Sequence, residues 1–403
     1  MIVLIAIATL SLSLLIWLFL LLFWGQFWRG QTNLDLCYQS IAREQDRYHD
    51  KYPIVWAIVP VRNEAGVISD SLSSLLEQDY PEEFNIVLVD DQSTDQTTTI
   101  AQKIAQKLNC EAKLHIVTGG ALPVGWKGKI WAIAQGIDYV STQNIQPDYF
   151  LLTDGDIQHD HHNLQKLVDF AQIKQLDLVS LMVLLRCQSF WEKLLIPAFV
   201  FFFEKLYPFN WVNDPQKSIA AAAGGCILIR RQTLEAIGGI SVIRDALIDD
   251  CSLAQKVKAQ NFKIWLGLTS TNISLRPYKN LKSIWDMVAR NAFTQLNYSI
   301  WLLIMAVLGM ILLYLSSLIA LIVGIIYQNI AIAILGVITW LLMTIAYFPT
   351  IKLYQLSLWW SLSLPAIAFL YILMTIDSAR KYWSGEGEAW KGRIYQKSNQ
   401  KND

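Results

Sequence analysis

The sequence predicts an α/β domain with a mostly parallel sheet, joined to membrane-spanning helices at both ends. From Lys51 to about Leu275, apolar runs of strand length alternate with segments of helical periodicity, which is typical of sheets whose strands are linked by helices. Apolar blocks long enough to cross a bilayer, about 20 helical residues, lie on either side. Hydrophobic residues make up 54% of the chain and charged residues only 16%, against about 25% charged in soluble domains.

Net charge and cysteine spacing argue against two classes of function, nucleic-acid binding and zinc binding. The formal net charge is zero, so nothing suggests a nucleic-acid partner. The five cysteines are scattered without a Cys-x-x-Cys pair, which fits a reducing compartment and argues against a zinc site.

The central region is expected to contain five strands and four helices before residue 185. The strands are Ile54–Val59, Asn85–Val89, Lys113–Val117, Tyr149–Thr153 and Asp177–Val183. The helices are Val67–Leu76, Thr97–Leu108, Lys129–Tyr139 and Asn163–Lys174. Asp95 is a candidate cap for the second helix. Because ligands of such sheets bind beyond the carboxyl ends of the strands, residues that follow a strand are the first candidates for a site.

The first apolar block, Ile2–Trp24, is expected to be an uncleaved anchor over residues 1–28. A signal peptide would need a basic start, a shorter apolar stretch and a small-residue cleavage site, and none is evident. Arg29, Arg43 and Arg47 follow the block, and by the positive-inside rule they place the next segment in the cytoplasm.

Three further apolar blocks fill residues 298–377: Ser299–Tyr327, Ile330–Tyr347 and Leu356–Ile376. Three full crossings after a cytoplasmic domain would leave the polar tail, 378–403, outside, although this tail is rich in Lys and Arg. Either the positive-inside rule fails here or one block does not cross the membrane. In the second case, Pro365 breaks the last block into a re-entrant pair, or the first block forms two tight passes. A further segment, 190–209, is very apolar but interrupted by Pro197, Glu204 and Pro208, and is interpreted as interfacial or else as a buried core helix.

Three acidic clusters are the strongest chemical signal. Asp90-Asp91 and Asp154-Gly155-Asp156 follow predicted strands, and Asp249-Asp250 opens a helical segment. A carboxylate at a strand end is able to accept from a nucleobase N–H. Two carboxylates separated by one small residue suit a divalent cation such as Mg²⁺ or Mn²⁺, which prefer oxygen ligands. The third cluster could supply a general base for a hydroxyl nucleophile. Taken singly, each cluster could instead make turns or cap a helix.

Two loops add to these clusters. Pro60–Glu64, which contains Arg62, follows the first strand and could contact a ribose or a base. Gly125–Lys129 is a glycine-spaced basic loop before a helix, so Lys129 and backbone N–H groups could approach a diphosphate. His159, His161 and His162 follow the second acidic cluster; His159 is a candidate metal contact, although solvated loop histidines are favoured.

Together these residues resemble the family 2 inverting glycosyltransferases of GT-A fold, from about Tyr52 to Arg290. Within that family the chain is most similar to the membrane-bound hopene-associated glycosyltransferases. The stretches that carry the likeness are VRNEAGVISDSLSSLLEQDYP, VLVDDQSTDQT, LPVGWKGKIWAIAQG, LLTDGDIQH, LVSLMVLLRCQSFWEKLLIPAFVFFFEKLYPF, AAAAGGCILIRR, ALIDDCSLA and MVARNAFTQL. The resemblance implies a Rossmann-like GT-A domain over residues 50–297.

The resemblance also implies roles. Asp250, with Asp249, would be catalytic, and Asp250 would be the base. Asp156 would be the main metal ligand, together with Asp154. The predicted donor-binding residues are Arg62, Glu64, Asp91, Lys129, Asp154 and Arg290. One feature departs from the family: many relatives carry Gln-x-x-Arg-Trp after the acidic pair, and here only Arg290 of Met287–Asn291 matches.

The implied activity is transfer of a sugar from a nucleotide sugar, usually of UDP, to a lipid hydroxyl, with inversion and with a divalent cation, in hopanoid-related lipid metabolism. The implied location is the inner (cytoplasmic) membrane, with the catalytic domain in the cytoplasm. The alternatives are a ceramide-type or other glycolipid glucosyltransferase and, from another class, a catalytically inactive membrane scaffold that binds no nucleotide sugar.

Overall fold

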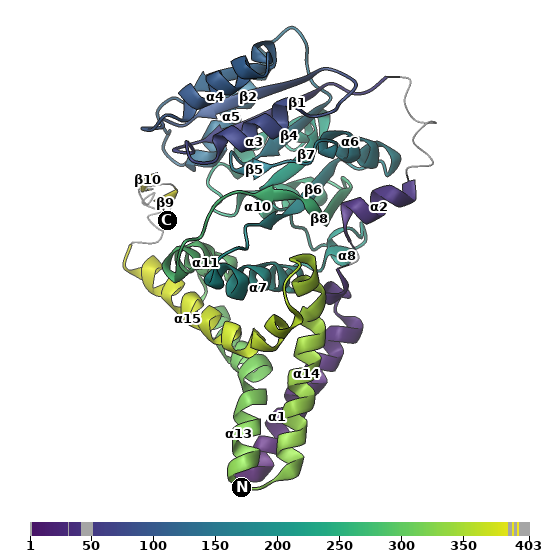
Figure 1. The fold of residues 1–403 in the computed structure, drawn as a ribbon, viewed down its shortest axis with the longest axis vertical. Coiled ribbons are helices and arrows are strands. Elements are labelled where there is room, and N and C mark those ends of the chain that lie inside the picture. Colours follow the sequence, from purple (N-terminus) through teal and green to yellow (C-terminus); the bar gives the residue numbers. More distant parts are fainter. Residues whose placement is uncertain (1, 31, 42–50, 386–388, 391–392, 395–403) are drawn as a thin grey trace, which may run out of the picture. The chain divides into compact units, whose positions relative to one another are not determined.

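The structure is a computed structural model that describes residues 2–30, 32–41, 51–385, 389–390 and 393–394. It divides into two compact units (Figure 1). The helical unit comprises Met1–Gly30, Cys187–Asn210 and Tyr278–Glu388, and the sheet unit comprises Gln31–Arg186, Trp211–Pro277 and Ala389–Asp403. Segments 187–210 and 278–297 therefore group with the apolar helices, although they lie inside the range expected for the α/β domain.

The sheet unit is built on one eight-stranded sheet with the strand order β3-β2-β1-β4-β7-β6-β8-β5. The strands are β1 (Val55–Val61), β2 (Phe84–Asp90), β3 (Leu114–Thr118), β4 (Tyr149–Thr153), β5 (Ile157–Gln158), β6 (Leu178–Leu185), β7 (Cys226–Arg230) and β8 (Ile264–Ser274). β1 pairs in parallel with β2 and β4, and β2 pairs in parallel with β3. β7 runs antiparallel between β4 and β6, so the sheet is mixed. The predicted α/β class is confirmed.

All the strands and helices predicted before residue 185 are present, with ends shifted by at most two residues. The helices of the sheet unit are α2 (Leu34–Ile41), α3 (Ile68–Leu76), α4 (Thr97–Lys107), α5 (Gly128–Ser141), α6 (Asn163–Ile173), α9 (Arg231–Ala236) and α10 (Asp249–Ala259). Asp95 accepts a 3.0 Å hydrogen bond from the backbone N–H of Thr97 at the start of α4. β8 was not predicted from the sequence, because its second half, which includes Thr269–Asn272, is polar.

The core of the sheet unit lies around β1 and β2, in which every residue is buried. Helices cover such strands on both faces, so the strands read as continuous apolar runs. α5 packs against β1 and β2. Its Gly136 permits a close approach, because a Cβ there would lie 2.6 Å from Ile58 Cγ2 and 3.0 Å from Val89 Cγ2. This packing holds the start of α5 near the carboxyl ends of the strands.

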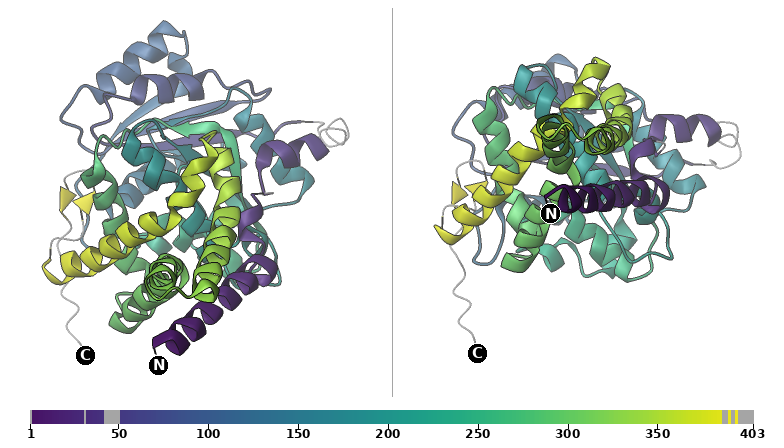
Figure 2. Two further views of the ribbon diagram at one scale, coloured as in Figure 1. Left: turned by 60° about the horizontal axis from the view of Figure 1, so that its bottom comes forward. Right: turned by 90° about the horizontal axis from the view of Figure 1, so that it is seen from below.

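The helical unit contains the apolar blocks predicted to cross a membrane. Its helices are α1 (Ile2–Phe23), α7 (Phe190–Leu206), α11 (Leu281–Gln295), α12 (Ile300–Met310), η5 (Ile311–Leu315, a π-helical turn), α13 (Ser316–Ile326), α14 (Ile330–Leu353) and α15 (Leu364–Trp383). Within the described residues, four segments are long and apolar enough to span a bilayer: Val3–Phe23, Ile300–Ile326, Ile330–Leu353 and Leu358–Trp383. α1, α13 and α14 pack side by side, as the two further views also show (Figure 2).

Two structural alternatives raised for the C-terminal blocks are not found. α12, η5 and α13 form one continuous run, Ile300–Ile326, rather than two tight passes. Pro365 lies in the first turn of α15, where its missing N–H costs no helical hydrogen bond, so it begins the helix instead of breaking it.

The segment predicted to be broken at Pro197 is one helix, α7. Pro197 lies inside it, and the helix is stabilised at its start by a capping box in which Ser189 and Glu192 bond reciprocally. The interruption expected at Pro197 was therefore wrong. Arg43 and Arg47, and most of the tail beyond Gly385, lie outside the described residues; the tail contributes a short antiparallel pair, Ala389–Trp390 with Arg393–Ile394.

Candidate active site

Parallel strands bring the first predicted site residues to one edge of the sheet. β1 ends before Arg62 and Glu64, β2 ends before Asp91, and β4 ends before Asp154. Because β1 pairs in parallel with both β2 and β4, the carboxyl ends of all three strands meet at this edge.

Arg62 and Asp91 form a pair across the ends of β1 and β2. The Arg62 guanidinium donates to the backbone carbonyl oxygens of Asp91 and Gln92, the latter at 3.3 Å, and its Nη1 lies 3.7 Å from Asp91 Oδ2. The Asp91 side chain is fully buried, whereas 16% of the Arg62 side chain is exposed. Arg62 therefore covers the carboxylate and presents the accessible surface of the pair.

Arg276, which the sequence analysis did not single out, lies between two predicted site residues. Its Nη2 donates to Glu64 Oε1 at 2.9 Å, and its Nε donates to Asp156 Oδ2 at 3.3 Å. The hydroxyl of Ser274, at the end of β8, donates to the same Asp156 oxygen at 2.8 Å. The position of Arg276 just after a strand could have marked it as a site residue, but β8 was not predicted.

Lys129, in the first turn of α5, connects the second and third acidic clusters. Its Nζ lies 2.9 Å from Asp154 Oδ1 and 3.2 Å from Asp249 Oδ2. Burial opposes the charged form of Lys129, but the carboxylates of Asp154, Asp249 and Asp250 outweigh it and raise the pKa of the ammonium. The basic loop and the carboxylates at residues 154 and 249 thus belong to one site.

Backbone N–H groups orient the carboxylate of Asp250. Gly224 N–H donates to Oδ2 at 2.8 Å, and Cys251 N–H donates to Oδ1 at 2.7 Å. Apolar side chains of α5, β4, β7 and α10, together with Lys129 and Asp249, line a small cavity beside it. Burial, helped by the negative charge of Asp249, raises the pKa of Asp250 to about 6, against the opposing effects of Lys129 and the two N–H groups.

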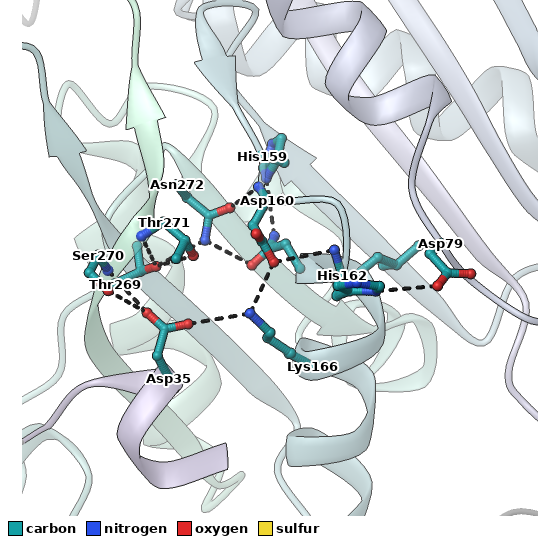
Figure 3. Close-up of polar contacts among 12 residues, drawn as sticks. Asp35, Asp79, His159, Asp160, His162, Lys166, Thr269, Ser270, Thr271 and Asn272 are labelled. Atoms are coloured by element: carbon teal, nitrogen blue, oxygen red, sulfur yellow. Dashed lines mark hydrogen bonds and ion pairs between the residues drawn. The ribbon is translucent and has the colours of Figure 1, made fainter. Parts of the chain in front are cut away.

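A polar network that includes His159, Asp160 and Asn272 follows the loop that carries Asp154 and Asp156 in the sequence; Figure 3 shows these three residues. The His159 ring bonds to Thr153 Oγ1 at 2.9 Å and to the Asn163 amide at 3.1 Å. Asn272 of β8 accepts from the Asp160 N–H and donates to Asn163 Oδ1, both at 2.9 Å. These bonds tie the loop to α6 and β8, which fixes the positions of its two carboxylates.

The two roles predicted for His159, a metal contact or a solvated loop residue, are both wrong. Only 5% of it is exposed, both ring nitrogens are bonded within the protein, and burial lowers its pKa to about 4. Burial of an uncharged imidazole is permitted because its polar atoms are bonded. His161 and His162 are exposed, as expected.

The chemistry of two carboxylates fits a hard divalent cation, which takes oxygen ligands. Asp154 is 35% exposed, and both protein contacts of Asp156 described above use Oδ2. Within the described residues, no three His, Cys, Asp or Glu side chains converge on one point. Oxygens of a bound diphosphate or water would have to complete the coordination, as is usual for Mg²⁺.

Arg290 lies on α11, which belongs to the helical unit, and its side chain is exposed. Its predicted contact with a donor stays a prediction. In the sheet unit, the arginine beside Glu64 and Asp156 is Arg276.

The sequence and the fold were compared with those of known proteins. The family model described as "Glycosyl transferase family 2" matches residues 56–238. The poly(ribitol-phosphate) beta-N-acetylglucosaminyltransferase TarS of Staphylococcus aureus is 46% identical over 65 residues. These residues are 16% of this chain and only 11% of TarS.

Among solved structures, the mannosyltransferase PcManGT from Pyrobaculum calidifontis, in complex with GDP-Man and Mn²⁺, has a TM-score of 0.53 and is 18% identical, covering 85% of this chain and 94% of that one. At this identity the likeness concerns the fold. The predicted GT-A fold is confirmed, and residues 56–238 match the glycosyltransferase family 2 model.

Proposed function

We propose that this protein is a membrane-bound inverting glycosyltransferase that moves a sugar from a nucleotide sugar, with UDP as the expected nucleotide, to the hydroxyl of a lipid. The observation that carries the proposal is the position of Lys129, which links Asp154 to Asp249 beside Asp250. A group suited to binding a diphosphate and a group suited to accepting a proton would thereby act in one pocket.

The donor side of this site would be formed by residues at the strand ends. Arg62, which covers Asp91, is the surface that a nucleoside would meet. Glu64 and Asp156 hold the Arg276 guanidinium in place, and a positioned guanidinium is well suited to diphosphate oxygens. PcManGT was solved with GDP-Man and Mn²⁺, which supports a nucleotide-sugar donor here.

A divalent cation held by Asp156 and Asp154 would supply positive charge to stabilise the departing diphosphate. Lys129 contributes a second positive charge beside Asp154. The carboxylates of Asp154 and Asp249 already neutralise this ammonium. Lys129 would therefore contact the diphosphate only when the bound donor replaces one of these two carboxylates as its partner.

Asp250 would act as the general base. The N–H groups of Gly224 and Cys251 fix the direction of its carboxylate. An acceptor hydroxyl in the pocket would transfer its proton to Asp250 as its oxygen bonds to the anomeric carbon and the diphosphate leaves from the opposite face. Asp249 would hold Lys129 near the diphosphate while raising the proton affinity of Asp250.

A lipid acceptor is supported by the four apolar segments rather than by the relatives. TarS is named for a poly(ribitol-phosphate) acceptor, whereas this chain joins its domain to helices long enough to span a bilayer. The hopanoid assignment rests on the resemblance of the quoted stretches to hopene-associated enzymes.

The burial of α15 supports an orientation with the domain and tail in the cytoplasm. In the most apolar window of the last segment, 56% of residues are buried inside the protein, against 22%, 22% and 33% for the other three. α15 also makes polar contacts with α11, since Lys381 Nζ lies 2.7 Å from Asp286 Oδ1. If α15 lies in the interface and the other three segments cross, the basic tail is returned to the cytoplasmic side, as the positive-inside rule requires.

The proposed function is tested with the purified full-length protein in lipid nanodiscs. Radiolabelled UDP- and GDP-sugars are supplied with a membrane lipid extract, and labelled lipid is separated by chromatography. A labelled glycolipid is expected with one donor. If no donor stabilises the protein against thermal unfolding and none labels lipid, the inactive-scaffold alternative is correct.

The pH dependence of transfer should report Asp250. Only the ionised carboxylate accepts a proton, so kcat/KM should fall about tenfold per pH unit below a pKa of about 6. In Asp249→Asn the inflection should move to lower pH, because a neighbouring negative charge is removed. A profile that is flat down to pH values near 5 would exclude Asp250 as the base.

Gly224→Ala should displace the Lys129 ammonium from its position beside Asp154 and Asp249. An added Cβ would lie 2.9 Å from Lys129 Nζ and 3.3 Å from Asp250 Oδ2. Because two carboxylates hold the ammonium, its displacement should lower kcat/KM about tenfold, which corresponds to about 1.4 kcal/mol. The matched control is Gly66→Ala, where a Cβ has no neighbour within 4 Å; equal kinetics for the two variants would show that the position of the Lys129 ammonium is unimportant.

A further inference from the structure

Lys205, near the C-terminal end of α7 in the helical unit, holds its ammonium among aromatic side chains. Its Nζ donates to the Tyr314 hydroxyl at 2.7 Å. It also lies 4.7 Å from the centroid of the Tyr314 ring and 5.4 Å from that of Phe202. Both distances are within the range of cation–π attraction.

The side chain of Lys205 points into the apolar segment rather than toward water, the direction usual for lysines near a membrane surface. Its backbone lies at the end of the α1 segment, since Trp24 Nε1 donates to the Lys205 carbonyl at 2.9 Å and α1 ends at Phe23. Its ammonium contacts Tyr314, whose ring packs edge-on against Trp17 at 5.5 Å.

Trp17 is about two helical turns, roughly 10 Å, inside α1 from Trp24, and its indole N–H donates to the Leu313 carbonyl at 2.8 Å. The ammonium is therefore directed into the apolar segment, whereas lysines at a membrane surface normally extend toward water.

The hydrogen-bonding capacity of this ammonium is not met by the described protein groups. An ammonium has three N–H donors, and Tyr314 accepts one. In the part of the chain that the structure describes, no carboxylate lies within ion-pair distance of Lys205. The neighbouring Glu204, which is 5% exposed, makes no ion pair with it there either. A cation that lies among apolar side chains without a counter-charge is costly, and an ionisable residue inside a membrane segment indicates a binding function.

Tyr314 is built into the fold in an unusual way. It lies in the π-helical turn η5, which interrupts the helix between α12 and α13, and such turns are frequent at functional sites. Tyr314 is fully buried. Its hydroxyl oxygen accepts from Lys205, so its own proton is left to donate to a second acceptor.

We propose that Lys205, held in position by Tyr314, binds the phosphate of an anionic phospholipid. The phosphate would accept from the two remaining ammonium N–H groups, while the buried Tyr314 hydroxyl keeps the third. The Lys205 backbone lies at the end of the α1 segment, where the anions are lipid head groups, and part of the residue is exposed. This site does not depend on the proposed transferase activity.

The experiment compares the thermal unfolding of the purified full-length protein in detergent with and without added phosphatidylglycerol. The lipid should raise the Tm of the native protein and of Lys205→Arg, which keeps the charge, because a ligand stabilises the state that binds it. Lys205→Met should show no rise in Tm and should co-purify with about tenfold less phosphatidylglycerol. Tyr314→Phe should show a smaller rise than the native protein.

Controls separate this site from general attraction of lipids to basic residues. Lys352→Met, which removes an exposed cation at the end of α14, should respond to phosphatidylglycerol like the native protein, and phosphatidylcholine should have a much smaller effect. The proposal is wrong if Lys205→Met, folded as judged by a cooperative transition, responds like the native protein. It is also wrong if inorganic phosphate alone reproduces the shift, since the ligand would then be a free anion.

Discussion

Asp250→Asn is expected to reduce the rate of sugar transfer by about 10²–10⁴-fold, the contribution typical of a positioned general base. The amide has nearly the shape of the carboxylate but does not accept a proton at neutral pH. Because Lys129, Asp154 and Asp156 are unchanged, nucleotide-sugar binding should persist. The reduction should therefore fall on kcat, with KM for the donor little affected.

This substitution also has a structural effect that must be measured separately. Asp250 accepts from two backbone N–H groups, and an asparagine would turn its NH₂ group toward one of them. The unmet N–H should cost about 1–3 kcal/mol. Thermal unfolding of the variant distinguishes this loss of stability from the loss of catalysis.

Asp245→Asn is the matched control, since Asp245 is an exposed carboxylate in the segment that leads into α10. It should transfer sugar at the native rate. Loss of a general base should slow transfer far more than about threefold. If Asp250→Asn is folded and transfers sugar within about threefold of the rate of Asp245→Asn, another group accepts the proton.

Asp156→Asn should reduce kcat/KM by roughly 10²–10³-fold, mostly through weaker donor binding. The substitution removes the negative charge that holds Arg276 at 3.3 Å and the oxygen expected to bind a divalent cation. Arg276 would keep its contact with Glu64 at 2.9 Å, so the fold around β8 should survive. Loss of charge stabilisation of this kind is worth several kcal/mol in related chemistry.

Metal removal gives a second measurement of the same site. EDTA should abolish transfer by the native protein, and added Mg²⁺ or Mn²⁺ should restore it, whereas Asp156→Asn should recover little at the same metal concentration. Asp138→Asn, an exposed carboxylate near the end of α5, is the control and should behave like the native protein. Undiminished transfer in EDTA would reject the metal role of Asp154 and Asp156.

The sequence was a good guide to the position of each candidate site residue that follows a predicted strand. Arg62, Glu64, Asp91 and Asp154 were found because a strand end is a local feature, visible in the change from apolar to polar residues. Their meeting at one edge followed from the rule that parallel strands align their carboxyl ends. Lys129 was found in the same way, at the start of a helix.

Arg276 and His159 could not be found in this way. Arg276 reaches Glu64 and Asp156 because β8 pairs in parallel with β6 and antiparallel with β5, and the polar half of β8 hid the strand. His159 reads as a loop residue, yet Thr153 and Asn163 bond to its ring only once β4 and α6 are packed together.

The sequence by itself therefore determined the α/β class, the apolar segments and the carboxylates available for chemistry, because periodicity and strand ends depend on neighbouring residues. Only the tertiary structure decided which charges pair: Lys129 with Asp154 and Asp249, and Arg276 with Glu64 and Asp156. These pairs depend on strand order and register, which no local pattern encodes and which bring together residues 25 to 212 positions apart.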